Sequence, residues 1–186
     1  MKITGSAIAV LSTHHAAETA VKRLSAEGFE TKYLSVVGRG YQSEEAVIGF
    51  YDAGRNGKVW GVRGEFWGTL WGGFSGGIFL KSPVFGHLII LGYLATTVIS
   101  VIEAAEENPA ILRGLSALGT ALCYVGIPKD SALYYEAAMK GDEFLVMAHG
   151  SAATMINAKM ILGKLIPSCL GMHVGGEQVD ATARTG

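Results

Sequence analysis

The chain has 186 residues, the length of one domain or of one domain with a large insertion. Its formal net charge is −1, so no overall positive charge is available to recruit nucleic acid. The hydrophobic fraction of 49% and the mean hydropathy of +0.33 are high for a soluble protein and low for a polytopic membrane protein. Cys123 and Cys169 lie far apart and outside any CxxC motif, which favours reduced thiols over a disulfide or a metal site.

The first 52 residues predict a strand, a helix and two further strands. Residues 7–11 form a short apolar run typical of a buried strand, and Ser12 or Thr13 can cap the helix that follows. Gly28 predicts the end of that helix. Residues 31–37 and 45–52 then read as the second and third strands.

The end of the chain predicts helix, strand and helix. The first helix begins near Pro128 and ends at Gly141, residues 143–150 form a buried strand, and Ser151 begins a helix that runs to about Leu165. Together the two ends predict an α+β, ferredoxin-like split β-α-β-β-α-β sheet with an added C-terminal helix. We expect three parts: a discontinuous α/β domain over residues 1–53 and 128–166, a hydrophobic helical insertion over 54–127, and a tail over 167–186. From Met172 onward the tail lacks periodicity, so we expect that segment to be disordered or held only by a partner.

The insertion holds three apolar stretches, 60–80, 84–102 and 112–127, and the first carries a glycine at every fourth position. These are Gly64, Gly68, Gly72 and Gly76. Such spacing lets another helix approach closely, so we expect the first two stretches to form a glycine-zipper helical hairpin that turns at Lys81-Ser82-Pro83.

Two environments fit this hairpin. The second stretch has 19 residues without a formal charge, close to the roughly 20 that span a bilayer. Aromatic and charged residues near the two ends of the hairpin would mark the membrane interface: Trp60, Trp67, Trp71 and Arg63 at one end and Lys81 at the other. The alternative is a hairpin buried between subunits of a soluble oligomer, which the short first arm and His87 favour.

Ionisable residues near the insertion offer a weak metal site. Glu103 and Glu107 share a helix face, and with Glu65 or His87 they could line a site between the arms. No Glu-x-x-His spacing supports this, so a solvated helix end is the simpler interpretation. His14 and the neighbouring His15 precede a helix, where they could contact an anion or simply lie in solvent.

Motifs for catalysis are absent from the sequence. The glycine- and arginine-containing segments 38–40 and 54–64 match neither GxGxxG nor GxxxxGK[ST], and no GxSxG occurs. We therefore expect no enzymatic activity, and no cofactor is indicated.

Several segments resemble a known group of small bacterial proteins. "AVLSTHHAAETAVKRLSAEGFETKYLSVV" is similar to the opening of general-stress-protein-like, YflT-type domains. "FWGTLWGGFSGG" and "GIPKDSALYYEAAMKGDEFLVMAHG" resemble the related DUF1269 family, in which a glycine-rich hydrophobic hairpin interrupts an α/β domain. The resemblance covers roughly residues 5 to 165 and implies a stress-linked or membrane-associated role without an established reaction.

The sequence supports two hypotheses. The first is a non-enzymatic homo-oligomer that assembles through the glycine zipper and lies in the cytoplasm, at the inner face of the membrane or inserted in it, with itself and lipid as partners. The second is a soluble oligomer whose apolar helices enclose a chamber for a hydrophobic molecule or a metal.

Overall fold

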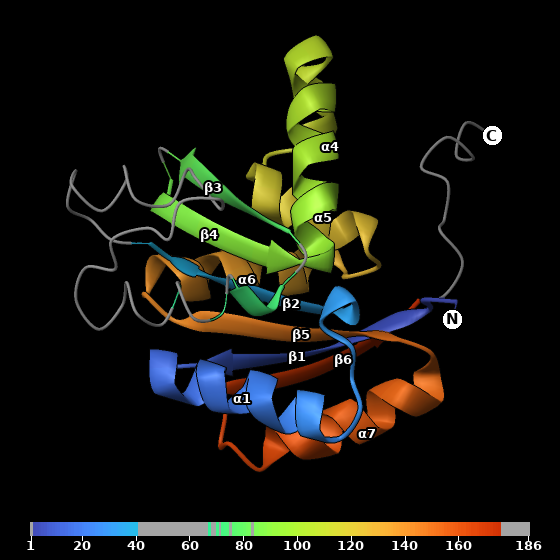
Figure 1. Ribbon diagram of the computed structural model, residues 1–186. Coiled ribbons are helices and arrows are strands. Elements are labelled where there is room, and N and C mark those ends of the chain that lie inside the picture. Colours follow the sequence, from blue (N-terminus) through green and yellow to red (C-terminus); the bar gives the residue numbers. More distant parts are fainter. Residues whose placement is uncertain are drawn as a thin grey trace.

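The computed structural model describes residues 2–40, 67, 70, 72–74, 76–82 and 84–175. Its centre is a six-stranded antiparallel sheet in the order β3-β4-β2-β5-β1-β6 (Figure 1). The strands are β1 (Gly5–Leu11), β2 (Leu34–Arg39), β3 (Gly77–Ser82), β4 (Gly86–Gly92), β5 (Phe144–Gly150) and β6 (Cys169–Val174). The helices are α1 (His14–Ala26), α4 (Tyr93–Glu107), α5 (Ala117–Tyr124), α6 (Lys129–Lys140) and α7 (Ala152–Gly163), with short 3-10 turns at Thr31–Tyr33 and Pro109–Leu112.

Helices cover both faces of the sheet. The helices α1 and α7 lie on one face and α4, α5 and α6 on the other, so the sheet separates two hydrophobic cores (Figure 1). Alternation along each strand supplies both cores: in β5, Val146 faces α1 and α7, whereas Leu145 and Met147 face the other three helices. This double coverage explains why β1 and β5 are buried along their whole length.

The chain ends supply the middle of the sheet. The strand β5 lies between β1 and β2 and is antiparallel to both, so α1 connects two strands that run in the same direction and are not neighbours. The helix α7 then leads from β5 to β6, on the other side of β1. The structure confirms four predicted elements: the strand at 7–11, the helix at 128–141, the strand at 143–150 and the helix from Ser151.

Helix caps agree with the sequence. The Thr13 hydroxyl accepts a hydrogen bond from the backbone N–H of Ala16 and caps α1, and Ser151 caps α7 in the same way through Thr154. Gly28, with φ 92°, follows α1 directly. The predicted strand at 45–52 lies outside the described residues.

The predicted hydrophobic helical hairpin is wrong over the part that the structure describes. Gly72 and Gly73 are helical, but residues 77–82 and 86–92 form the antiparallel strands β3 and β4. The turn lies further along the chain than predicted, because Lys81 and Ser82, expected in the turn, belong to β3 and pair with His87 and Gly86 of β4. Ile78, Phe79, Ile89 and Ile90 are branched or aromatic residues that favour strands, and β4 finds a partner strand in β2.

The tail also differs from the prediction. Residues 169–174 lie in the tail, for which no strand was predicted, and they form the border strand β6, which pairs with β1. The composition of this segment, with Gly171 at its centre, gives only a weak strand signal. The hydrogen bonds that order it come from β1, which lies more than 150 residues earlier in the chain.

Candidate functional site: a buried polar row and an open sheet border

A row of polar side chains crosses one end of the sheet on the face of α4, α5 and α6. His149 of β5 lies between two serines of the neighbouring strands: its Nδ1 is 2.9 Å from the Ser6 hydroxyl and its Nε2 is 2.8 Å from the Ser35 hydroxyl. All three residues have no exposed surface. Each ring nitrogen therefore has a hydrogen-bond partner, as a buried imidazole requires.

The row also fixes the beginning of α4. The Ser35 hydroxyl accepts a hydrogen bond of 2.9 Å from the backbone N–H of Leu94, in the first turn of α4. The ring of Tyr93 lies over the His149 ring, with 4.6 Å between their centroids. Burial lowers the pKa of His149 to about 3, so the imidazole is neutral at physiological pH.

A neutral imidazole between two hydroxyls is the arrangement from which serine nucleophiles are activated. Ser6 and Ser35 have no exposed surface, so neither hydroxyl can reach a substrate in this conformation. The row instead joins β1, β5, β2 and α4 through hydrogen bonds that the surrounding apolar core makes strong. Its role in the described fold is structural.

The row continues to the border of the sheet. His173 of β6 lies opposite Ser6 in the strand register, and its Nε2 is 3.1 Å from the hydroxyl of Tyr135 on α6. Burial raises the pKa of Tyr135 to about 12 and lowers the pKa of His173. Both groups are therefore neutral at physiological pH, and their hydrogen bond holds α6 against the last strand.

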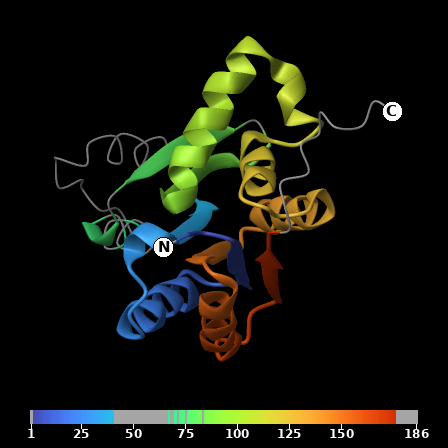
Figure 2. The ribbon, with the colours of Figure 1, turned by 90° about the vertical axis from the view of Figure 1, so that its right-hand side faces the viewer.

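Exposed apolar side chains surround this border on both faces of the sheet. On one face Met160 and Ile156 of α7 are more than half exposed, and on the other Leu133 and Tyr134 of α6 are almost half exposed. Figure 2 shows β6 at the border of the sheet, with α7 on one side of it and α6 on the other. We call β6 together with these four side chains the β6 border.

The outer side of α7 carries two large apolar side chains, beside the exposed Asn157 and Lys159. Met155, Ala158, Ile161 and Leu162 are buried, while Ile156 and Met160 face outward. Ile156 lies seven residues before Gly163 and shares its helix face, and a Cβ at Gly163 would lie 3.3 Å from the side chain of Leu170 in β6. The outer stripe of α7 therefore lies beside β6.

A shallow hollow of about 380 Å³ lies between α4 and the end of α5. Its lining residues are Thr96, Thr97, Ser100, Val101, Ala104 and Tyr124. The hydroxyls of Thr96 and Ser100 donate to carbonyls of their own helix, so they can offer only acceptor positions to a ligand.

The glycine and aromatic site candidates are only partly described. Gly64, Gly68, Trp60, Arg63 and Trp71 lie outside the described residues. A Cβ at Gly72 or at Gly76 would meet no atom of the described residues within 4 Å, so no close approach among those residues requires a glycine at either position. Lys81 lies in β3.

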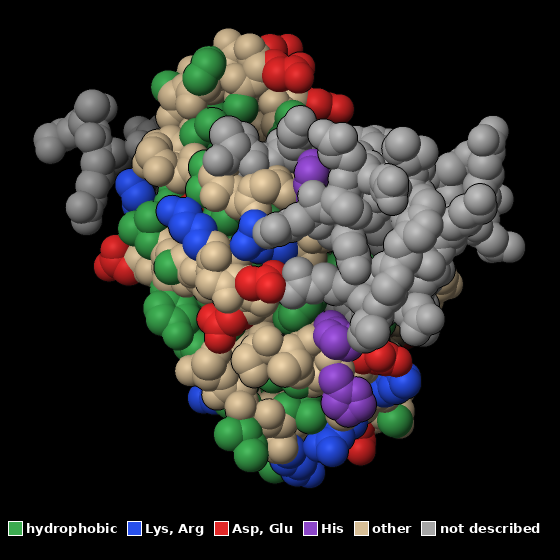
Figure 3. Space-filling view, turned by 90° about the vertical axis from the view of Figure 1, so that its left-hand side faces the viewer, with side chains coloured by type: hydrophobic (Ala, Val, Ile, Leu, Met, Phe, Trp, Pro, Cys, Tyr) green, Lys and Arg blue, Asp and Glu red, His purple; other side chains and the backbone are tan. Residues whose placement is uncertain are grey.

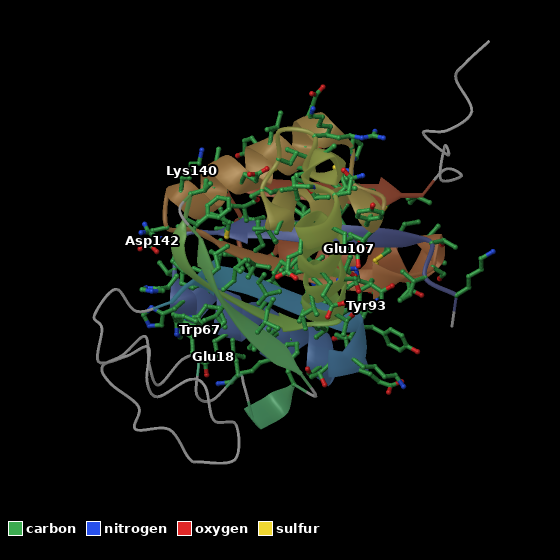
Figure 4. All side chains as sticks on the ribbon, turned by 90° about the horizontal axis from the view of Figure 1, so that it is seen from above. Glu18, Trp67, Tyr93, Glu107, Lys140 and Asp142 are labelled. Carbon is green, nitrogen blue, oxygen red and sulfur yellow. The ribbon has the colours of Figure 1, made fainter. Side chains whose placement is uncertain are left out.

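Trp67 is a core residue, which corrects its assignment to a membrane interface. It has no exposed surface, its ring lies 6.1 Å from the ring of Phe144, and its indole N–H donates to the carbonyl of Arg39. A Cβ at Gly38 would lie 2.8 Å from Trp67, so the glycine of β2 leaves room for the indole. Figure 4 shows Trp67 and Tyr93 toward opposite ends of the sheet.

The metal-site candidates do not come together. Glu103 and Glu107 are exposed on α4, whose outer end carries acidic side chains in Figures 3 and 4. His87 stacks on Phe79, which packs on the opposite face of the sheet, toward α1 and α7. Glu65 lies outside the described residues. Among the residues that are described, no three His, Cys, Asp or Glu side chains gather as metal ligands would.

Three further observations bear on function. In the described ranges, no helix combines the length and the apolar composition that crossing a membrane requires. His14 is half-buried and His15 exposed at the beginning of α1. Comparison of the chain with protein-family models, with curated proteins and with solved structures gives no match.

Sequence reasoning missed both the polar row and the β6 border. The available signal for the row was one serine or histidine near the end of each of three mostly apolar strands. These strands are "GSAIAVL", "LSVVGR" and "FLVMAHG". Nothing in those segments says that the three polar residues are neighbours, because that depends on strand order. The outer stripe of α7 could be found from its isoleucine and methionine, which interrupt the polar face expected of a surface helix.

Proposed function

We propose that the protein is a non-enzymatic homo-oligomer that assembles through the β6 border. The observation that carries this proposal is the apolar outer stripe of α7 beside an open sheet edge. A stripe of this kind, continued by Leu133 and Tyr134 across β6, typically marks an interaction site. We further propose that the middle of the sheet, with α1 and α7, is a ferredoxin-like core extended by the insertion.

Self-association is favoured over a catalytic role because the histidine most suited to chemistry is sealed in the interior. It is favoured over membrane binding because the apolar surface follows a strand edge whose outward backbone groups pair with no other strand among the described residues. A second strand can satisfy those groups, whereas lipid cannot.

Mass measurement of the full chain by light scattering, without detergent, tests the proposal. We expect a particle of at least twice the 19.6 kDa of one chain, and Met160→Glu should reduce it to one chain mass by placing a charge in the interface. The matched control is Ile99→Glu on α4, another exposed apolar residue, which should leave the mass unchanged. A wild-type monomer would refute the proposal. Wild-type monomer that floats with anionic vesicles would assign the surface to a membrane instead.

The hollow between α4 and α5 supports a second candidate function, the binding of a small molecule. Its lining has no charged side chain and combines Val101 and Ala104 with the phenol of Tyr124. A neutral ligand with an apolar body and a hydrogen-bond donor would fit such a surface. Native mass spectrometry of protein purified from cells tests this candidate function. A mass above that of the bare chain in the wild type, and its loss in Tyr124→Ala, would support ligand binding. The mass of the bare chain at every charge state would argue against it.

A further inference from the structure

We infer that β6 pairs antiparallel with β6 of a second copy of the chain, about a two-fold axis at Met172, so that two sheets join into one. This inference rests on the proposed self-association and names its partner and its geometry. Face-to-face packing of α7 helices would also give a dimer, but would leave the edge of β6 open.

The backbone of β6 alternates between its two sides. Gly175 donates its backbone N–H to the carbonyl of Thr4, and His173 lies opposite Ser6 in the same register. In an antiparallel pair every second residue directs both backbone groups at the neighbouring strand. Gly171 and His173 therefore face β1, and the backbone groups of Leu170, Met172 and Val174 face outward, away from the sheet.

This outward edge lacks the features that normally keep sheet edges apart. The strand β6 contains neither a charged residue nor a proline, whereas β3 at the opposite border carries Lys81. Charged residues and prolines are the usual protection of an exposed edge. An unprotected edge that is also flanked by apolar side chains is suited to receive another strand.

The charges at the two ends of β6 are complementary under a two-fold axis. At the beginning of the strand the Glu143 carboxylate accepts a hydrogen bond of 2.9 Å from the Ser168 hydroxyl. At the other end the chain carries Lys2, exposed and two residues before the Thr4 that bonds Gly175. Antiparallel pairing places the beginning of one strand beside the end of the other, and so brings Glu143 toward Lys2 of the second copy. A second copy of the same chain is therefore an occupant with matching charge.

Symmetry restricts the axis to a residue, and the two residues at the centre of β6 are Gly171 and Met172. Residues opposite each other must point to the same face, so the axis passes through a residue and not between two residues. An axis at Gly171 would pair Val174 with Ser168, whose N–H already donates to the carbonyl of Val10. An axis at Met172 pairs Leu170 with Val174 and uses only backbone groups that face outward. The second register makes more hydrogen bonds and is the one we assign.

The assigned register also covers the exposed apolar surface. Val174, which is 44% exposed, lies against Leu170 of the second copy. Because the axis is perpendicular to the sheet, α7 lies beside α7 of the second copy, and Met160 meets its counterpart. On the other face the same operation brings the two α6 helices and their Tyr134 side chains together.

Disulfide trapping tests the register in the full chain. In a background with Cys123→Ser and Cys169→Ser, Met172→Cys places the new thiol opposite itself, with a Cα separation of about 5.5 Å that suits a disulfide. Leu170→Cys is the matched control, on the same strand and the same face, because its two copies would be four positions out of register, about 14 Å apart. Under mild oxidation we expect the first variant to form covalent dimers and the second to remain uncrosslinked. Adding Val174→Cys to the control should restore the crosslink.

The outcomes separate this inference from the proposed function. If the wild type is a dimer but Met172→Cys does not crosslink, or crosslinks no faster than Leu170→Cys, the strand pairing is overturned and self-association stands. A monomeric wild type would overturn both. Met172→Cys should still crosslink when it is combined with Ile99→Glu, and should not when it is combined with Met160→Glu. This result would support both the strand pairing and the proposed self-association. Circular dichroism of each variant confirms that the chain is folded before its crosslinking is interpreted.

Discussion

The free energy of unfolding should fall as the pH drops below the ordinary pKa of histidine, because burial disfavours protonation of His149 in the folded state. Its pKa is about 3 in the folded chain and 6.5 when exposed. Below pH 6.5 the unfolded chain therefore binds a proton that the folded chain does not. The stability contributed by the neutral imidazole is complete above the unfolded pKa and is lost as the pH falls toward the folded pKa.

The size of this effect follows from the two pKa values. Between about pH 7.5 and about pH 5 the linkage removes about 2 kcal/mol, and the loss grows by about 1.4 kcal/mol per further pH unit until the folded pKa is approached. His173, whose pKa is also lowered by burial, adds to the loss with the same sign. A difference between variants is therefore needed to isolate His149.

Urea denaturation at a series of pH values measures this difference. We expect His149→Gln to be less stable than wild type at neutral pH and to lose about 2 kcal/mol less between about pH 7.5 and about pH 5. His15→Gln, at an exposed position of α1, is the matched control and should keep the wild-type slope. An unchanged slope in His149→Gln would refute the reasoning, because the buried imidazole would then not be the group that resists protonation.

Four further substitutions test the packing. Gly38→Ala should cost about 1–3 kcal/mol in urea denaturation, because the added Cβ would lie 2.8 Å from Trp67. Gly72→Ala, whose Cβ meets no atom of the described residues within 4 Å, should leave stability within about 0.5 kcal/mol or raise it. Ser35→Ala removes hydrogen bonds to the imidazole and to the first turn of α4, so we expect a loss of about 2–3 kcal/mol, and a loss below about 0.5 kcal/mol would contradict the row's structural role. Gly92→Ala adds a Cβ at φ 86° that collides with a backbone carbonyl of β2, and thermal unfolding should show the largest loss of this group; a melting temperature equal to wild type would count against the strand register.

Elements near the two ends of the chain were predictable because their local patterns agree with their tertiary environment. Thr13 and Ser151 are strong caps, and the apolar positions of α1 recur at helical spacing along one face. "FLVMAHG" is apolar throughout and is buried on both faces in the middle of the sheet. Here propensity, capping and burial favour the same structure.

The apolar stretch 84–102 could not be assigned correctly, because it changes from strand to helix without a polar break. Gly92, with φ 86°, ends β4, and the helix begins at Tyr93. A continuous apolar run fits a membrane helix, a buried helix or a buried strand equally well, so periodicity does not distinguish them. Pairing of β4 with β2 on one side and β3 on the other decides the outcome.

The sequence by itself determined the composition class, the lack of a catalytic motif and the helices and strands whose caps and periodicity are local. Only the tertiary structure decided that β5 lies between β1 and β2, and this placement brings His149 against Ser6 and Ser35, each more than 100 residues earlier in the chain. It likewise ordered β6 against β1 and left the outer stripe of α7 beside an open edge. Hydrogen bonds between distant strands have no signature in local sequence, because each strand carries the same backbone groups whatever its neighbour.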